Sequence, residues 1–288
     1  MERWYFTKEQ LENSPSRKCG INSHTEHCLR HQAATLIENM SQSLQNISAK
    51  TPNRLSQTCV HTALVYMHRF YMCHSFTRFQ PNTIAPPVLL LADKMDFDRE
   101  EALLIEDLIH AAEISQSLPR ITVTGQYKGQ VEDIILHENL LLQTLGFNLD
   151  IEHPHKHVLK ACTLIRVPED VVLSAQFMAS CSAHLTTMCL QYKPTLVACF
   201  SLYLVLKWAN WEIPLSCEGR TWFTYIDDEV TEDKLVELTR EFLDDFDKLP
   251  SKLKDKINAI RSRKVGRKTK LKEGKLKRKL EESVFPIS

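Results

Sequence analysis

Apolar residues recur at three- and four-residue steps along much of this 288-residue chain, and this spacing constrains the fold more than any other feature. In the first clear example they are Ala33, Leu36, Ile37, Met40 and Leu44. Because an α-helix has 3.6 residues per turn, such residues share one helical face. The chain has only seven glycines, so the commonest turn residue of β-architectures is scarce. The sequence therefore predicts an all-α protein with short connections.

The helical segments form two sets on either side of a linker near 148–157. We predict the first set at 25–44, 55–70, 88–95, 101–113 and 131–145, and the second at 157–165, 169–190, 195–208 and 231–249. Pro86 and Pro87 are expected in the first turn of the third segment or in the loop before it, because proline lacks a main-chain N–H. A weak internal similarity at an offset of 113 residues, which pairs Leu91 with Leu204, suggests a duplicated unit.

Charge divides the chain into an acidic body and a basic tail. Residues 248–279 hold 15 of the 36 Lys and Arg residues and two acidic residues, whereas residues 1–247 hold 21 basic and 32 acidic residues. We therefore expect these parts to do different work. Together with the two helical sets, this division predicts four regions. They are a docking segment at 1–24, helical domains at 25–150 and 151–250, and a disordered or helical basic tail at 251–288.

The basic clusters of the tail are typical of nuclear-localisation signals. They comprise Arg263, Lys264, Arg267, Lys268, Lys277, Arg278 and Lys279. Almost no aromatic residue lies between them, so any RNA contact would be electrostatic and sensitive to salt. A solubilising tail is the alternative. We expect the protein in the nucleus.

Several other classes of function are not indicated. No apolar run is long enough to span a bilayer, and the phosphate-loop, zinc-protease and serine-hydrolase motifs are absent from the sequence. A histidine and cysteine group at helical spacing, composed of His24, His27, Cys28 and His31, fits no common zinc module. We therefore predict no enzyme activity, metal, cofactor, membrane partner or small-molecule substrate.

Several long segments resemble one known family. Tyr66–Met72 resembles the second helix of the cyclin box in the transcriptional cyclins T and K. The segments Arg3–Phe6, His184–Thr187 and Lys207–Pro214 are similar to cyclin T in particular. The matches run in order from Arg3 to about Leu249. The resemblance implies two tandem five-helix cyclin boxes, with a short N-terminal docking segment and the basic C-terminal tail.

The resemblance also implies a partner and a surface that binds it. Transcriptional cyclins activate a cyclin-dependent kinase by holding its αC helix, and here the expected kinase resembles cyclin-dependent kinase 9 in positive transcription elongation factor b (P-TEFb). Such a kinase phosphorylates the RNA polymerase II C-terminal domain and promotes transcription elongation. The matching polar positions are Lys94 and Glu138, and by the same analogy Leu90, Leu91 and Phe147 line the apolar part of the surface.

The segment Met95–Glu101 departs from the family pattern. It lacks the usual proline, and a basic pair of the family has become acidic. This change leaves open a pseudo-cyclin that binds the kinase without activating it. A nucleic-acid-binding adaptor with cyclin-like repeats is a further alternative, but the sequence has no C-x-x-C pair, and the acidic body would repel phosphate.

Overall fold

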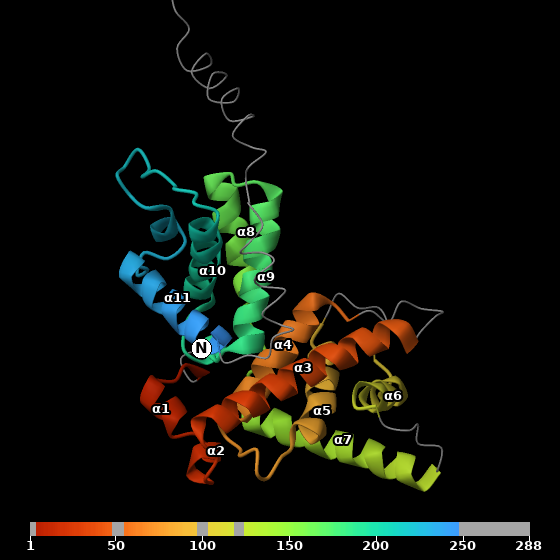
Figure 1. Cartoon of the computed structure of the whole chain (residues 1–288). Coiled ribbons are helices and arrows are strands. Elements are labelled where there is room, and N and C mark those ends of the chain that lie inside the picture. Colours follow the sequence, from red (N-terminus) through yellow and green to blue (C-terminus); the bar gives the residue numbers. More distant parts are fainter. Residues whose placement is uncertain (1–3, 48–54, 97–102, 118–123, 248–288) are drawn as a thin grey trace, which may run out of the picture. The chain divides into compact units, whose positions relative to one another are not determined.

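The computed structural model describes residues 4–47, 55–96, 103–117 and 124–247 (Figure 1). These residues form α-helices, short 3-10 turns and connections, with no strand among them, which confirms the all-α prediction. The chain divides into two compact units. The first is Met1–Pro154 with Ser180–Val197, and the second is His155–Ala179 with Ala198–Ser288.

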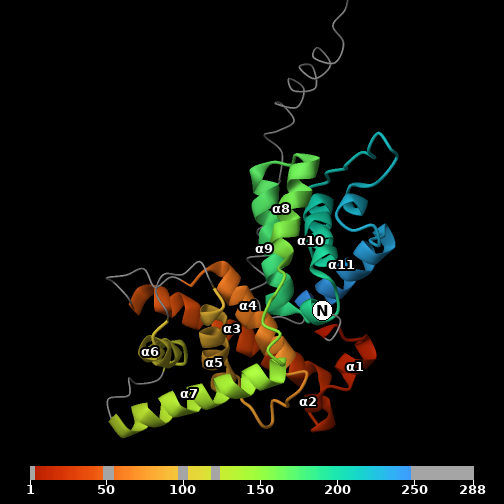
Figure 2. The same ribbon diagram turned by 180° about the vertical axis from the view of Figure 1, so that it is seen from behind.

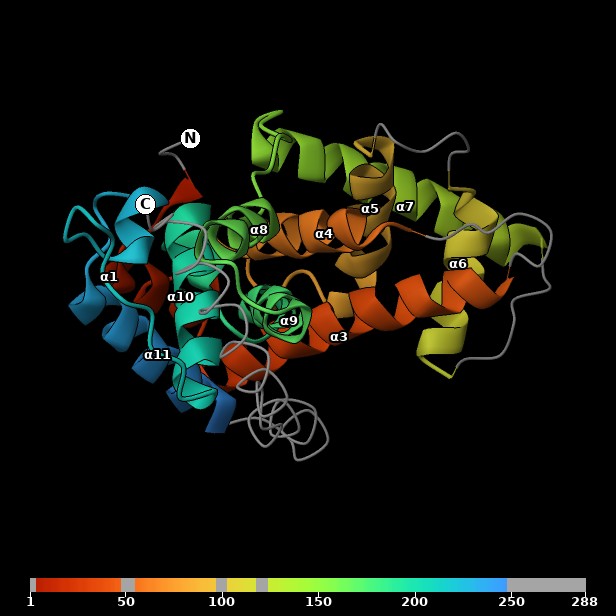
Figure 3. The same ribbon diagram turned by 90° about the horizontal axis from the view of Figure 1, so that it is seen from above.

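The first unit is built around a five-helix arrangement with α5 at its centre. Its helices are α3 (Ser23–Ile47), α4 (Gln57–Phe70), α5 (Pro81–Lys94), α6 (Ile105–Ser115) and α7 (Thr124–Leu145). α5 contacts each of the other four, and Figures 2 and 3 show it between α3 and α7. This matches the first five-helix set expected from the apolar periodicity.

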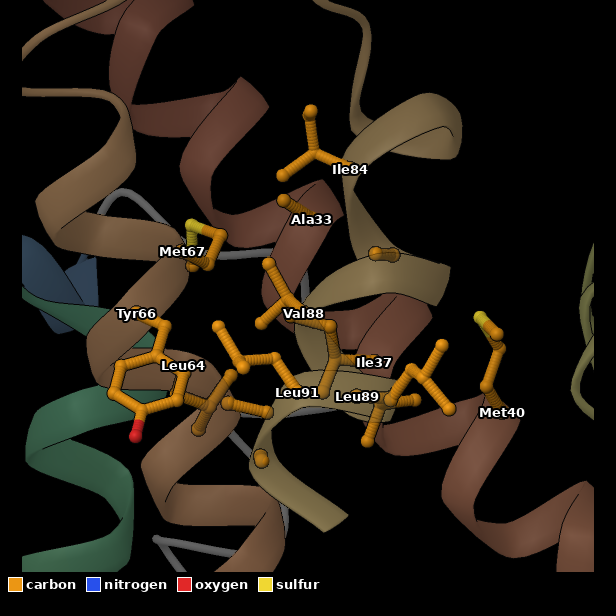
Figure 4. Close-up of a cluster of buried hydrophobic side chains, with 14 of the residues drawn as sticks. Ala33, Ile37, Met40, Leu64, Tyr66, Met67, Ile84, Val88, Leu89 and Leu91 are labelled. Carbon is orange, nitrogen blue, oxygen red and sulfur yellow. The ribbon is translucent and has the colours of Figure 1, made fainter. Parts of the chain in front are cut away.

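α5 occupies the centre because it is apolar on nearly every face, as a helix buried on all sides must be. Figure 4 shows its Val88, Leu89 and Leu91 packed together with side chains from α3 and α4. Those partners include Ile37 and Met40 of α3 and Leu64, Tyr66 and Met67 of α4, all buried. Burial of this kind stabilises the fold by roughly 1.5–3 kcal/mol per large apolar side chain.

The structure corrects the expected start of α5. The helix begins at Pro81, and Pro86 and Pro87 lie inside it instead of before it. Pro81 occupies the first turn, where a missing N–H has no consequence for the helix. The two inner prolines are buried in the first unit, so tertiary packing offsets their low helix propensity. Propensity alone would not have placed them there.

The N-terminal segment belongs to the first unit, and its short helices have their own caps. It contains α1 (Lys8–Glu12), which Thr7 and Gln10 start with a capping box, and α2 (Pro15–Lys18), which Ser14 caps. Trp4 is buried, with the Arg69 guanidinium 5.2 Å from the centre of one of its rings. The Phe6 N–H donates to the carbonyl of Leu190 at 2.7 Å.

A buried ion pair joins this segment to α3. The Glu26 carboxylate accepts hydrogen bonds from Ser14 Oγ at 2.8 Å, Arg17 Nε at 2.7 Å and Arg30 Nη2 at 2.9 Å. Burial by itself would raise the pKa of Glu26, but the charge of Arg30 and the hydrogen bonds from Ser14 and Arg17 outweigh it, and the pKa is lowered. Arg30 also donates to the carbonyls of His68 and Tyr71 at 3.3 Å.

The second unit includes most of α8 (Pro154–Ile165) and α9 (Glu169–Leu185), the greater part of α10 (Pro194–Trp208), and α11 (Glu232–Asp247). The rings of Phe200 in α10 and Phe242 in α11 pack with centroids 5.5 Å apart. Between α10 and α11 the described residues form no α-helix. They form a 3-10 turn, η3 (Trp222–Tyr225), whose Trp222 and Phe223 are buried.

The end of α9 differs from the prediction. α9 ends at Leu185, earlier than the predicted 190, because the Thr186 side chain bonds the carbonyl of Ser182 and accepts from the N–H of Met188. A 3-10 turn, η2 (Met188–Leu190), follows it.

Among the helices that the structure describes, none is both long enough and apolar enough to cross a membrane.

Candidate functional site

Lys94 and Glu138 form an ion pair between two helices of the first unit. Lys94 is the last residue of α5, and Glu138 lies in the second half of α7. Lys94 Nζ donates to Glu138 Oε1 at 2.6 Å and to Oε2 at 2.8 Å. The Lys94 side chain is 51% exposed and that of Glu138 is 10% exposed. The structure therefore brings together the two residues that the sequence paired across 44 positions.

This geometry is suited to holding polar groups of a partner. The carboxylate of Glu138 is fixed in place by its burial, and it holds the flexible lysine in one direction. An ammonium group has three donors, and Glu138 accepts two of them. One donor remains for a main-chain carbonyl of a partner, such as those left unpaired at the end of a helix.

The segment that follows α5 is anchored on both sides. Near its start, Asp96 Oδ2 accepts a hydrogen bond from Ser56 Oγ at 2.5 Å. After it, the N–H of Leu103 donates to the buried carboxylate of Asp93 at 2.8 Å. Asp96 belongs to the divergent stretch Met95–Glu101, of which residues 97–101 are outside the described residues.

Phe147 follows the end of α7 in an unusual backbone conformation. Gly146 and Phe147 have φ values of +60° and +58°, in the left-handed region that bulky residues seldom adopt. The N–H of Phe147 donates to the carbonyl of Leu142 at 3.1 Å, which ends the helix. The side chain is 72% exposed, so little burial in this chain compensates for the strained backbone. An exposed aromatic residue on a strained backbone is typical of a contact site.

Leu90 and Leu91 have a different place from the one expected. They are 2% and 3% exposed and belong to the core of the first unit, so their side chains do not line a surface. They support α5, which carries Lys94 at its end. Two apolar residues that the sequence reasoning missed, Ile135 and Leu136, are exposed on α7. The sequence could have indicated their exposure, because they fall outside the apolar stripe of Ile134, Leu141 and Leu145 on this helix.

The other candidates do not form a site in the described part of the chain. No group of three or more His, Cys, Asp or Glu residues there is placed to hold a metal ion. Of the candidate zinc ligands, His24 Nε2 lies 3.7 Å from Cys28 Sγ, and the His31 ring packs edge-on against His184. The basic tail candidates at 263–279 lie outside the described residues.

Comparison with known families defines the class of both halves. Residues 3–150 match the family model described as cyclin, N-terminal domain. Residues 153–244 match the model described as cyclin-T2-like, C-terminal domain. Together with the helical architecture and the Lys94–Glu138 pair, these matches define a cyclin with two cyclin domains.

Individual relatives narrow the class further. The chain is 46% identical to Cyclin-T of Drosophila melanogaster over 90% of its length, and 45% identical to human Cyclin-T2 and to human Cyclin-T1 over 93%. The chain belongs to the cyclin-T family. It spans only 22% of the Drosophila protein and 36% of each human protein.

Solved structures show the same fold at much lower sequence identity. A chain of the yeast RNA Pol II CTD kinase CTDK-1 complex superimposes with a TM-score of 0.66 at 14% identity, covering 85% of this chain and 72% of that one. A chain of yeast TFIIK (Kin28/Ccl1/Tfb3) superimposes with a TM-score of 0.55 at 17% identity, covering 84% of this chain and 95% of that one.

Proposed function

We propose that this chain is the regulatory subunit of a transcriptional cyclin-dependent kinase that resembles cyclin-dependent kinase 9. It binds the kinase through the first unit and promotes phosphorylation of the RNA polymerase II C-terminal domain, and with it transcription elongation. The observation that carries the proposal is the preformed Lys94–Glu138 pair on a cyclin-T framework. The described residues offer a surface for binding, and the catalytic groups belong to the kinase.

The relatives and fold neighbours support the identity of the partner. The family matches span nearly the whole described chain, and the matches to human Cyclin-T1 and Cyclin-T2 each cover 93% of it. One fold neighbour comes from a complex named as an RNA Pol II CTD kinase. Another comes from a complex that contains Kin28. A cyclin that inserts Lys94 and Phe147 against a kinase helix can shift that helix toward its active position.

The test is copurification of the tagged chain with recombinant cyclin-dependent kinase 9, followed by a kinase assay on a polymerase C-terminal-domain peptide. Lys94→Ala with Glu138→Ala should lower the affinity at least about tenfold, because both charge-assisted contacts are lost. Removing both partners avoids leaving a buried, unpaired carboxylate, so the double variant should remain folded.

The matched control is another ion pair on the helical surface. Lys234 Nζ lies 2.7 Å from Glu237 Oε2 on α11, in the second unit. Lys234→Ala with Glu237→Ala removes the same charges and should leave kinase binding unchanged. Full kinase activity of the Lys94 and Glu138 double variant would contradict the assignment of this surface to kinase binding.

Binding without activation is the second candidate, and the divergent stretch 95–101 motivates it. In that case the copurified kinase would show no more activity than the kinase alone. Replacing the stretch with the family pattern of two glutamates, a proline and two lysines would then restore activity. If the native chain activates the kinase in the first assay, this candidate is rejected.

We further propose that the basic tail directs nuclear import and contacts RNA through charge alone. Arg263→Ala, Lys264→Ala, Arg267→Ala and Lys268→Ala together should abolish nuclear accumulation of a fluorescently tagged full-length chain. RNA binding by the native chain should weaken steeply between 50 and 200 mM salt, by about tenfold or more. Nuclear accumulation of the quadruple variant would contradict the import role of these four residues.

A further inference from the structure

A cavity of about 260 Å³ lies in the first unit among the N-terminal half of α5, α6 and α7. These three helices lie side by side in Figures 1 and 2, and α5 contacts both of the others. Its apolar walls include Pro86, Ile109 and Ile134. The cavity is separate from the proposed kinase surface, because Asn82 in its wall and Lys94 are about 18 Å apart along the axis of α5.

The cavity has an excess of hydrogen-bond acceptors. Asn82 and Thr83 line it, and their carbonyls would accept hydrogen bonds from residues 86 and 87 in a regular helix. Those residues are Pro86 and Pro87, which have no N–H to donate. Gln130 also lines the cavity, and its Oε1 is buried with no hydrogen-bond partner. Asn82 is exposed and Thr83 is half-buried, so Gln130 Oε1 is the buried acceptor of this set. Acceptors that lack a donor within the protein favour a ligand that donates hydrogen bonds.

The remaining polar groups of the cavity are two carboxylates, the amide of Gln116 and the ring of His137. The carboxylates are those of Glu113, which is 5% exposed and has His110 Nδ1 3.5 Å from its Oε2, and of Asp133, which is exposed. His137 Nδ1 donates to the carbonyl of Asp133 at 2.7 Å, which leaves Nε2 as the other polar atom of the ring. No Lys or Arg is among the described residues that line the cavity. Its charge therefore favours a cation.

We propose that this cavity binds one arginine side chain, presented by an extended segment of a partner protein. Arginine is positively charged and has five N–H donors and no acceptor, which suits separate acceptors and carboxylates. Its alkyl stem can pack along Pro86, Ile109 and Ile134 while the guanidinium reaches the polar groups. The volume accommodates one long side chain and is too small for a helix.

The first experiment uses N-acetyl-arginine amide as the probe, titrated into the ¹⁵N-labelled full chain. Saturable chemical-shift changes are expected at the main-chain amides of residues 82–83 and 130–137. The control probe is N-acetyl-citrulline amide, which has nearly the same shape and no charge. It should bind about tenfold more weakly, because neutral hydrogen bonds replace charge-assisted ones.

Variants locate the binding and separate it from the kinase surface. Asp133→Asn should weaken the arginine probe several-fold, whereas Glu132→Gln removes the same charge one residue away, outside the cavity, and should have no effect. Pro86→Ala returns a main-chain donor to the carbonyl of Asn82 and should also weaken the probe. Kinase binding should be unchanged in Asp133→Asn, so this inference and the proposed function can fail independently.

Three results would overturn the inference. The first is an absence of saturable shifts at residues 82–83 and 130–137. The second is equal affinity for the arginine and citrulline probes. The third is equal weakening by Asp133→Asn and Glu132→Gln, which would show only a general attraction of the probe to the acidic body.

Discussion

Lowering the pH from 8 to 5 should destabilise the first unit, because its fold keeps His68 neutral. His68 is 2% exposed, and its Nε2–H donates to the carbonyl of Ala183 at 2.8 Å. Burial and the nearby charge of Arg30 lower the pKa of His68 from 6.5 to about 3, and His184 and His27 add to this effect. The hydrogen bond to Ala183 opposes the shift without cancelling it.

The direction follows from where the proton binds. Below pH 6.5 the unfolded chain takes up a proton on this imidazole and the folded chain does not, so stability falls as the pH falls. The contribution of His68 is complete above pH 6.5 and declines down to the folded pKa of about 3. Each pH unit below 6.5 lowers the free energy of unfolding by about 1.36 kcal/mol, so the loss at pH 5 is about 2 kcal/mol.

Urea unfolding followed by circular dichroism at pH 8, 7, 6 and 5 measures this loss. Burial also lowers the pKa of His31, His74 and His155, so they contribute to the total pH dependence, and a variant is needed to isolate His68. His68→Gln is the suitable one, because glutamine can donate to Ala183 and carries no titrating group.

The free energy of unfolding of the variant should change by about 2 kcal/mol less than that of the native chain between pH 8 and pH 5. His24→Gln, at an exposed position, is the control and should follow the native chain. Identical pH dependence of His68→Gln and the native chain would show that burial does not keep this imidazole neutral.

Three further predictions concern single side chains. Glu26→Gln should lower the free energy of unfolding by about 3 kcal/mol in urea titrations, because it leaves the charge of Arg30 buried without a counter-ion; a change below about 1 kcal/mol would contradict this. Phe147→Gly should weaken kinase binding about tenfold in calorimetry while leaving the thermal midpoint nearly unchanged, since relief of the left-handed backbone offsets the added freedom of glycine. Tyr66→Phe should cost about 1 kcal/mol in the same urea titrations, because the carbonyl of Leu149 loses the hydroxyl that donates to it at 2.5 Å.

Much of the fold could be predicted from the sequence because helix periodicity is a local property. The spacing of Ala33, Ile37 and Met40 places them on one face of α3 without any knowledge of their partners. The family resemblance likewise singled out Lys94 and Glu138. Both kinds of information lie in short stretches of residues, which a sequence displays directly.

The details of the site depended on contacts between residues far apart in the chain. Pro86 and Pro87 lie inside α5 because packing offsets the propensity that disfavours them there. The same packing buries Leu90 and Leu91, which the family resemblance had placed on the surface.

The backbone of Phe147, the neutral state of His68 and the cavity beside α5 are also products of tertiary structure. The physical reason is that periodicity is set within one helix. Burial, pKa and the distance between two helices are set only when several helices pack together.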